Sequence, residues 1–319
     1  MAPALNKERG NSKSKMKNTR LLLTMLSALL TQTALIAQTA GPAAPAPGAP
    51  AAVAPAARAG GRGGATGGQK TLLIWADTRN CVAQHDMTSH AMAVIERLGY
   101  ESGAYRSFIR TDSEIISYAP QRTTGGNASG GPSLGSVDGI FSLTHREAPL
   151  SDTQKAELLK FIKEDGKGFV SAHTGLTAFQ TWPEFAEVIG GKYSPHLPIS
   201  PGTVINEDPN FPATKHWPAK LELIEEWYQL VNYSRDNIHV VLRLDLSDQP
   251  PGIARLAPLA GDWPLAWAKM YGNGRIFYSA FGHHPETWDN PMIQKMLFEA
   301  INWSLKLTDA DITPRPLPK

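Results

Sequence analysis

Between Thr71 and Ala172, short apolar runs alternate with segments of helical periodicity, and this alternation constrains the fold more than any other feature of the chain. The apolar runs predict buried strands at residues 71–76, 100–105, 137–143 and 167–172. The intervening segments predict helices at residues 86–98, 112–118 and 151–164. Gly99 is placed to end the first helix, and Ser151 with Gln154 forms a capping box that opens the last one. We therefore expect an α/β fold, a parallel sheet with helices on both faces.

Beyond Gly191 this alternation stops. Residues 193–218 contain six prolines, so we expect an irregular surface insertion after the helix that follows the fourth strand. Further extended segments are expected at residues 222–230, 239–244, 265–270 and 275–281. A helix at residues 290–305, with Pro291 in its first turn, closes the domain. Residues 123–135 read as a polar loop and residues 308–319 as a tail.

The first 69 residues differ in composition from the rest of the chain. Residues 1–37 resemble a secretory signal peptide, because basic residues precede an apolar run that is short for a membrane span, and small residues follow it. Translation from Met16 would give a more usual leader, and an uncleaved membrane-anchoring helix is the alternative. Residues 38–69, rich in Ala, Pro and Gly, predict a disordered linker. We therefore expect a folded domain at residues 70–307 and a secreted or periplasmic location.

Charge and cysteine content exclude two classes of protein. The formal net charge of +2 gives no electrostatic support to nucleic-acid binding. Cys81 is the only cysteine, so an internal disulfide framework is excluded and a buried thiol is expected.

The turn after the fourth strand has the spacing of a nucleophile elbow, G-x-S-x-G, in residues 171–175. Small residues on either side allow the chain to bend tightly and present one side chain above the sheet. Here that side chain is His173. An imidazole can move protons or bind a metal, but it is a poor acyl-transfer nucleophile.

Other histidines follow other strands. Ligands bind at the carboxyl ends of strands in open parallel sheets, and five of the nine histidines fall there, namely His85, His145, His173, His283 and His284. This convergence predicts a chemical site in which His173, His283 and His85 are the leading candidates. His145 and His284 also fit structural roles, and Asp86 fits a helix cap. The three leading imidazoles, with Asp86, could hold zinc or another divalent ion, although no local ligand spacing supports this.

An acidic and aromatic cluster lies further along the chain. Glu225 and Glu226 stand beside Trp227 and Tyr228. Such a cluster suits a sugar, whose apolar face stacks on rings while its hydroxyls bond to carboxylates. A solvated acidic pair is the alternative.

Together these motifs resemble the ThuA-like, or trehalose-utilisation, family. The matching pieces are His85-Asp86, residues 168–173, Phe179, residues 182–185, Gly190-Gly191, His196, residues 226–228, residues 272–278 and Gly282-His283. The resemblance implies a flavodoxin-like fold similar to class I glutamine amidotransferases, with His173 in place of their elbow cysteine. It also implies a role in carbohydrate metabolism. The long 123–135 loop and the secretory leader depart from shorter members.

The leading hypothesis is an exported enzyme that processes a keto-sugar or glycoside by histidine acid–base or metal-assisted chemistry. His173 would act as base or metal ligand, with His85 and His283 assisting. Asp86, Glu226, Tyr228 and His196 would bind the substrate. Isomerase, lyase and hydrolase chemistry all remain open. The alternative is a non-catalytic carbohydrate-binding or scaffold domain, and a glutamine amidotransferase ranks third because Cys81 is not at the elbow.

Overall fold

The computed structural model describes residues 68–78, 85–122, 124–128, 131–194, 196–249 and 262–317. The predicted signal peptide, nearly all of the predicted linker and Cys81 lie outside these residues. The segment Gly64–Lys319 forms one compact unit that contains every element described below.

Two sheets form the β structure. The strands are β1 (Lys70–Trp75), β2 (Tyr105–Arg110), β3 (Gly139–Ser142), β4 (Gly168–Ala172), β5 (Lys192–Ser194), β6 (Ser200–Asn206), β7 (Lys220–Glu225), β8 (Gln229–Val231), β9 (His239–Leu244), β10 (Pro264–Tyr271) and β11 (Gly274–Ser279). The main sheet has nine strands in the order β2-β1-β3-β4-β11-β10-β9-β6-β7, and β5 pairs with β8 in a small second sheet.

The main sheet has a parallel half and an antiparallel half. Strands β2, β1, β3, β4 and β11 are parallel to one another, whereas each pairing from β11 through β10, β9 and β6 to β7 is antiparallel. The parallel half follows the flavodoxin-like order 2-1-3-4-5, with its topological switch between β1 and β3. The predicted α/β class is confirmed, and the antiparallel extension was not foreseen.

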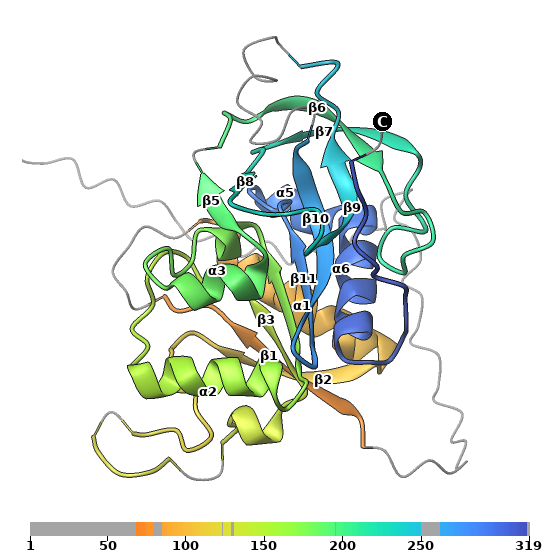
Figure 1. The fold of residues 1–319 in the computed structure, drawn as a ribbon. Helices are drawn as coiled ribbons and strands as arrows, with labels where there is room; N and C mark the ends of the chain where they lie inside the picture. Colours follow the sequence, from red (N-terminus) through yellow and green to blue (C-terminus); the bar gives the residue numbers. More distant parts are fainter. Residues whose placement is uncertain are drawn as a thin grey trace, which may run out of the picture. The chain divides into compact units, whose positions relative to one another are not determined.

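Helices cover both faces of the sheet. They are α1 (Thr88–Ser102), α2 (Asp152–Lys163), α3 (Pro183–Ile189), α5 (Pro285–Asp289) and α6 (Pro291–Ser304), with short 3-10 turns η1 (Leu134–Ser136) and η2 (His173–Leu176). Helices α1, α5 and α6 contact one another, and α2 and α3 pack against β11 from the other layer (Figure 1). Among the helices of the described residues, none has the length and apolar character needed to cross a bilayer.

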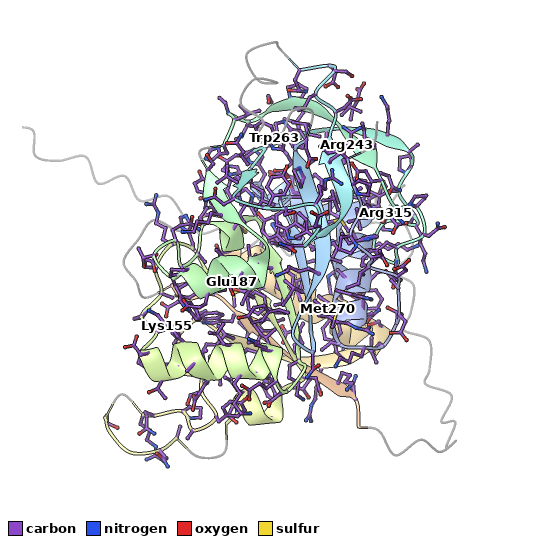
Figure 2. The ribbon with its side chains drawn as sticks, in the orientation of Figure 1. Lys155, Glu187, Arg243, Trp263, Met270 and Arg315 are labelled. Carbon is purple, nitrogen blue, oxygen red and sulfur yellow. The ribbon has the colours of Figure 1, made fainter. Side chains whose placement is uncertain are left out.

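Side chains from the sheet and the helices fill the space between the layers (Figure 2). Central strand β4 is buried along its whole length, as expected for a parallel strand covered on both faces. Trp182, Phe185 and Trp267 are among the buried aromatic residues of this core. The capping box predicted at the start of α2 is present, with the Ser151 hydroxyl accepting from the backbone N–H of Gln154.

The end of α1 and the position of β2 were predicted wrongly. Helix α1 continues through Gly99 and is capped by Gly103, whose φ of 69° is left-handed. Gly99 has a packing role instead, because a Cβ there would lie 2.2 Å from the ring of Tyr105. The Tyr105 hydroxyl donates to the Ile95 carbonyl at 2.8 Å. The strand expected at residues 100–105 therefore begins only at Tyr105.

Residues 112–118 form turns, not the predicted short helix. The Asp112 carboxylate pairs with Arg110, and the Ser113 hydroxyl donates to Asp77 at 2.5 Å. Both polar side chains that could have capped a helix are thus engaged elsewhere. Ile115 and Ile116 remain buried without helical periodicity.

The insertion predicted as irregular contains part of the main sheet. Strand β6 lies within residues 193–218 and pairs antiparallel with both β7 and β9. Pro201 occupies the second position of β6, near the strand start, where proline is tolerated. The extended segment predicted at residues 222–230 is divided between two strands, because β7 ends at Glu225 and β8 begins at Gln229. The predicted tail packs on the domain through a hydrogen bond between His239 Nδ1 and the Thr313 carbonyl, at 2.7 Å.

A buried lysine in β10 gives a test of the packing. Lys269 is 9% exposed, and burial lowers its pKa from 10.5 to about 8. Between these two pH values the unfolded chain holds a proton that the folded chain has released, so stability rises with pH across this window. We expect Lys269→Met to raise the free energy of unfolding at pH 7 by about 1–3 kcal/mol, an advantage that shrinks toward pH 10. Chemical denaturation at both pH values checks this, with exposed Lys295→Met as the control. A less stable Met variant at pH 7 would contradict it.

Candidate active site

A cavity of about 630 Å³ opens beside the carboxyl ends of the parallel strands. It is lined by His85, Asp86, His145, Arg146, Thr177, Gln180, Tyr193, His196, Glu226, Tyr228, His283, His284 and Pro285. The segments that follow β1, β3, β4 and β11 all contribute side chains, as expected near the switch point of this topology. The antiparallel half and its loops add His196, Glu226 and Tyr228.

The elbow holds His173 in a strained backbone conformation. Its φ is 40°, in the left-handed region that side chains other than glycine seldom adopt. The turn is tight because Gly175 faces Ser171, and a Cβ on Gly175 would lie 1.7 Å from the Ser171 hydroxyl oxygen. The strain at His173 costs on the order of 1–2 kcal/mol, and strain of this kind concentrates at functional sites.

The His173 ring is fully buried and its two nitrogens differ. Nδ1 lies 2.9 Å from the Ala280 carbonyl oxygen, which can only accept, so Nδ1 carries the hydrogen. Nε2 is buried without a hydrogen-bond partner among the described residues, 3.3 Å from Glu226 Oε2. The Tyr228 ring stacks on the imidazole at 4.2 Å, and the Tyr278 hydroxyl donates to the His173 carbonyl. The ring is therefore fixed with Nε2 facing the Glu226 carboxylate, and this nitrogen carries a lone pair in the neutral imidazole and a hydrogen in the imidazolium.

Glu226 is the common partner of four imidazoles. Its Oε2 lies 2.8 Å from His283 Nδ1 and 4.0 Å from His85 Nε2, in addition to its approach to His173. Its Oε1 lies 3.1 Å from His196 Nδ1. The carboxylate is only 8% exposed, so its charge depends on these neighbours for compensation.

Four of these side chains have the arrangement of a metal-ligand set. His85, His173, Glu226 and His283 each offer one ligand atom, and these atoms lie within 4.8 Å of one another. Three imidazoles and one carboxylate suit zinc and other first-row divalent ions. A cation among them would remove the conflict between the Nε2 lone pair of His173 and the Glu226 oxygen. The donor set and its unpartnered nitrogen therefore fit a metal.

The protonation states match this chemistry. Burial alone would raise the pKa of Glu226, but the imidazoles of His173 and His85 outweigh burial and hold that pKa well below its usual range. Burial also lowers the pKa of His283, against the opposing effect of Glu226. An ionised carboxylate and a neutral imidazole are the forms that bind metals. Burial and the Glu226 charge raise the pKa of Tyr228, which stays a neutral phenol.

Glu225 organises the loop that presents His283. Its Oε1 accepts from the Thr287 hydroxyl at 2.6 Å and from the backbone N–H of Gly282 at 3.2 Å. Its Oε2 accepts from the backbone N–H of Glu226 at 3.2 Å. Glu225 is 2% exposed, so the solvated-pair interpretation of Glu225 and Glu226 is wrong for both residues.

The structure places all the sequence-predicted site residues together. His85, Asp86, His196, Glu226, Tyr228 and His283 line the cavity, and His173 lies behind Tyr228 and Glu226. Their individual roles stay predictions. Asp86 does not cap α1, because Met87 holds the cap position. His145 and His284, for which structural roles were also considered, line the cavity as well.

Five lining residues were missed from the sequence, namely Arg146, Thr177, Gln180, Tyr193 and Pro285. Arg146 directly follows His145, so the same strand-end rule could have indicated it. Glu226 was assigned to the substrate, and only the fold brings it among the imidazoles.

Sequence and structure comparisons agree with this architecture. The family described as trehalose utilisation, ThuA, matches residues 71–304. The chain belongs to the ThuA family. This confirms the resemblance predicted from the sequence motifs, including the class I glutamine amidotransferase-like fold.

Two crystal structures of ThuA-like proteins resemble this ThuA domain. The protein from Bacteroides uniformis has a TM-score of 0.57 and 21% identity, over 76% of this chain and 94% of that chain. The protein from Parabacteroides merdae has a TM-score of 0.56 and 17% identity, over 79% and 94%. At these identities the likeness establishes the fold alone. No curated protein matches this sequence significantly.

The elbow geometry makes Gly175 irreplaceable. Gly175→Ala would drive a methyl group into the Ser171 side chain, so we expect a loss of unfolding free energy of about 2–4 kcal/mol or failure to fold. Thermal unfolding of the purified variants measures the effect. Gly131→Ala is the control, because a Cβ at Gly131 meets open space. Equal melting temperatures for the two variants would show that the turn relaxes freely.

Proposed function

We propose that this ThuA protein is a metal-dependent enzyme that acts on a carbohydrate. The observation that carries the proposal is the His173 Nε2 atom, which is buried, has no hydrogen-bond partner among the described residues and faces the Glu226 carboxylate at 3.3 Å. A structural histidine would normally satisfy both ring nitrogens. The lone pair of a metal ligand instead stays available until the ion binds.

His85, His173, His283 and Glu226 would hold the ion. When bound, a divalent ion supplies Lewis-acid polarisation of a sugar carbonyl or hydroxyl oxygen. The Ala280 carbonyl fixes the tautomer of His173, as partners behind metal-binding histidines commonly do. The cavity beside these residues is large enough for a small sugar.

Proton transfer then falls to His196 rather than to His173. His196 Nδ1 lies 2.9 Å from the Leu197 carbonyl and 3.1 Å from Glu226, two oxygens that accept a hydrogen bond. This leaves Nε2 as the atom that can take or give a proton. The His196 ring stacks on Tyr228 at 5.1 Å, which limits its rotation. The Tyr228 ring thus lies between His173, the buried ligand of the proposed ion, and His196, the half-buried acid–base group.

The substrate class and the location follow from other parts of the chain. The family is described by trehalose utilisation, which supports a carbohydrate substrate. The leader-like residues 1–37 support export, so we propose that the enzyme acts outside the cytoplasm.

Metal binding is the first property to test. The full chain, stripped with a chelator and dialysed against zinc, should retain about one equivalent by elemental analysis. Glu226→Gln and His173→Asn should each weaken zinc binding by more than about 100-fold, since even groups behind the ligands are worth roughly 10- to 100-fold. Asparagine tolerates the left-handed backbone at position 173. His90→Ala, which removes a partly exposed histidine away from the cavity, should bind zinc like the wild type.

Thermal unfolding shows whether the variants fold. Less than about a tenth of an equivalent of zinc, manganese, iron, cobalt or nickel in the folded wild type would overturn the metal assignment. A screen of the metal-loaded protein against disaccharides and their keto derivatives then tests turnover. Stoichiometric metal and sugar binding without any product would support the carbohydrate-binding alternative instead.

A further inference from the structure

The cavity lining also carries an exposed arginine. Arg146 follows β3 and lines the cavity together with Gln180 and Tyr193. Its positive charge lowers the pKa of Tyr193, although burial outweighs this effect and raises that pKa overall. Arg146 and Tyr193 thus share the cavity.

No acidic partner accounts for Arg146. Among the described residues, the arginines that form ion pairs are Arg97, Arg110, Arg235, Arg243, Arg275 and Arg315. Arg146 is not one of them, and no ion pair within the described residues joins it to Asp86 of the same cavity. An arginine has five N–H donors in a planar fork that matches a carboxylate. That fork remains available to a ligand.

The backbone around Arg146 is held in a costly conformation. Its φ is 58°, in the left-handed region, and the Phe179 that donates to its carbonyl at 3.1 Å has a φ of 51°. The neighbouring Glu147 accepts from the backbone N–H of Thr181 at 3.0 Å. These contacts tie the loop after β3 to the segment after the elbow and fix where Arg146 leaves the chain. Strain of this kind persists where the surrounding structure over-determines the position.

Few acceptors of the cavity lining are free to bind the hydroxyl groups of a ligand. Arg146 is cationic, as the ion of the proposed function would be. Glu226 is already surrounded by histidines, which leaves Asp86 as the one other carboxylate of the lining. A cavity built for neutral sugars would offer more free acceptors to hydroxyl groups.

We infer that the substrate is a sugar acid, whose carboxylate binds Arg146 while its hydroxyl or carbonyl oxygens face the metal-ligand set. This inference rests on the proposed function and adds the substrate class to it. The Tyr193 hydroxyl is a further donor in the cavity lining, whereas the Gln180 amide nitrogen already donates to the Leu176 and Ala178 carbonyls. Arg146 is then a specificity-determining residue, and the strained loop after β3 is the element that positions it.

Calorimetric titration of the zinc-loaded full chain tests the inference with two matched probes. D-glucuronate and D-glucuronamide have the same shape and differ in charge. We expect the wild type to bind glucuronate at least about 10-fold more tightly, the effect of one charge-assisted bidentate pair. Arg146→Gln should reduce this ratio below about 3-fold, and Arg146→Lys should retain part of it because lysine keeps the charge without the fork. Arg97→Gln, on the exposed face of α1, is the control for charge loss and should keep the wild-type ratio.

Three binding results would overturn the inference. Equal binding of both probes by the wild type, or binding of neither, overturns the inference. A preference that survives in Arg146→Gln also overturns it, because the carboxylate would then contact the ion directly. Zinc content, measured on the same samples, reports on the proposed function separately. A protein without zinc whose preference still depends on Arg146 would refute the metal proposal and leave the carboxylate site standing.

Discussion

The buried charge of Glu226 is the constraint on which the candidate site depends. A carboxylate that is 8% exposed must be compensated, and here the compensation comes from four imidazoles on four separate segments of the chain. Three of these segments follow parallel strands, whereas Glu226 follows β7 at the far edge of the sheet. The loop from β7 to β8 therefore has to reach back over the sheet, and Glu225 secures it there by accepting hydrogen bonds from the Gly282 N–H and the Thr287 hydroxyl. The antiparallel half of the fold completes a site that the parallel half alone would leave open.

Strain at the cavity follows from the same architecture. His173, Arg146 and Phe179 all adopt positive φ, and all three belong to the loops at the carboxyl ends of β3 and β4. Each conformation is unfavourable by itself, and the surrounding contacts must supply the difference. Gly175 allows the elbow to close on Ser171, the Ala280 carbonyl holds the His173 ring, and the Phe179 N–H fixes the Arg146 carbonyl. Rigid placement of side chains, rather than a mobile loop, is what this part of the molecule provides.

Local rules predicted the parallel half of the fold and much of the site. Apolar runs predicted the strands that precede His145 and His173. Because ligands bind at the carboxyl ends of parallel strands, the sequence also predicted that the imidazoles lie together at one edge of the sheet. Gly99 was wrongly predicted to end the helix. A glycine can either terminate a helix or allow a neighbouring group to pack closely, and only the position of the Tyr105 ring shows that Gly99 does the second. Strand β6 was not predicted because a high proline content argues against a strand. Pro201 lies near the start of β6, where a proline is compatible with strand pairing. The four histidines that surround Glu226 lie between 30 residues (His196) and 141 residues (His85) from it in the sequence, and no local pattern encodes such contacts.

The chemistry of the elbow residue follows from its burial. A general base must exchange protons with its substrate, which requires a free nitrogen in the cavity. His173 commits Nδ1 to a carbonyl and directs Nε2 at Glu226, with Tyr228 stacked against its ring, so it does not line the cavity at all. His196 shares the same carboxylate but is partly exposed, and its ring lies on the other stacking contact of Tyr228. The two histidines therefore divide the tasks that a nucleophile elbow usually combines. The buried one can hold an ion in place, and the accessible one can move a proton. Under the proposed function, the elbow would therefore set the position of the ion, and the groups around His196 would determine the type of reaction.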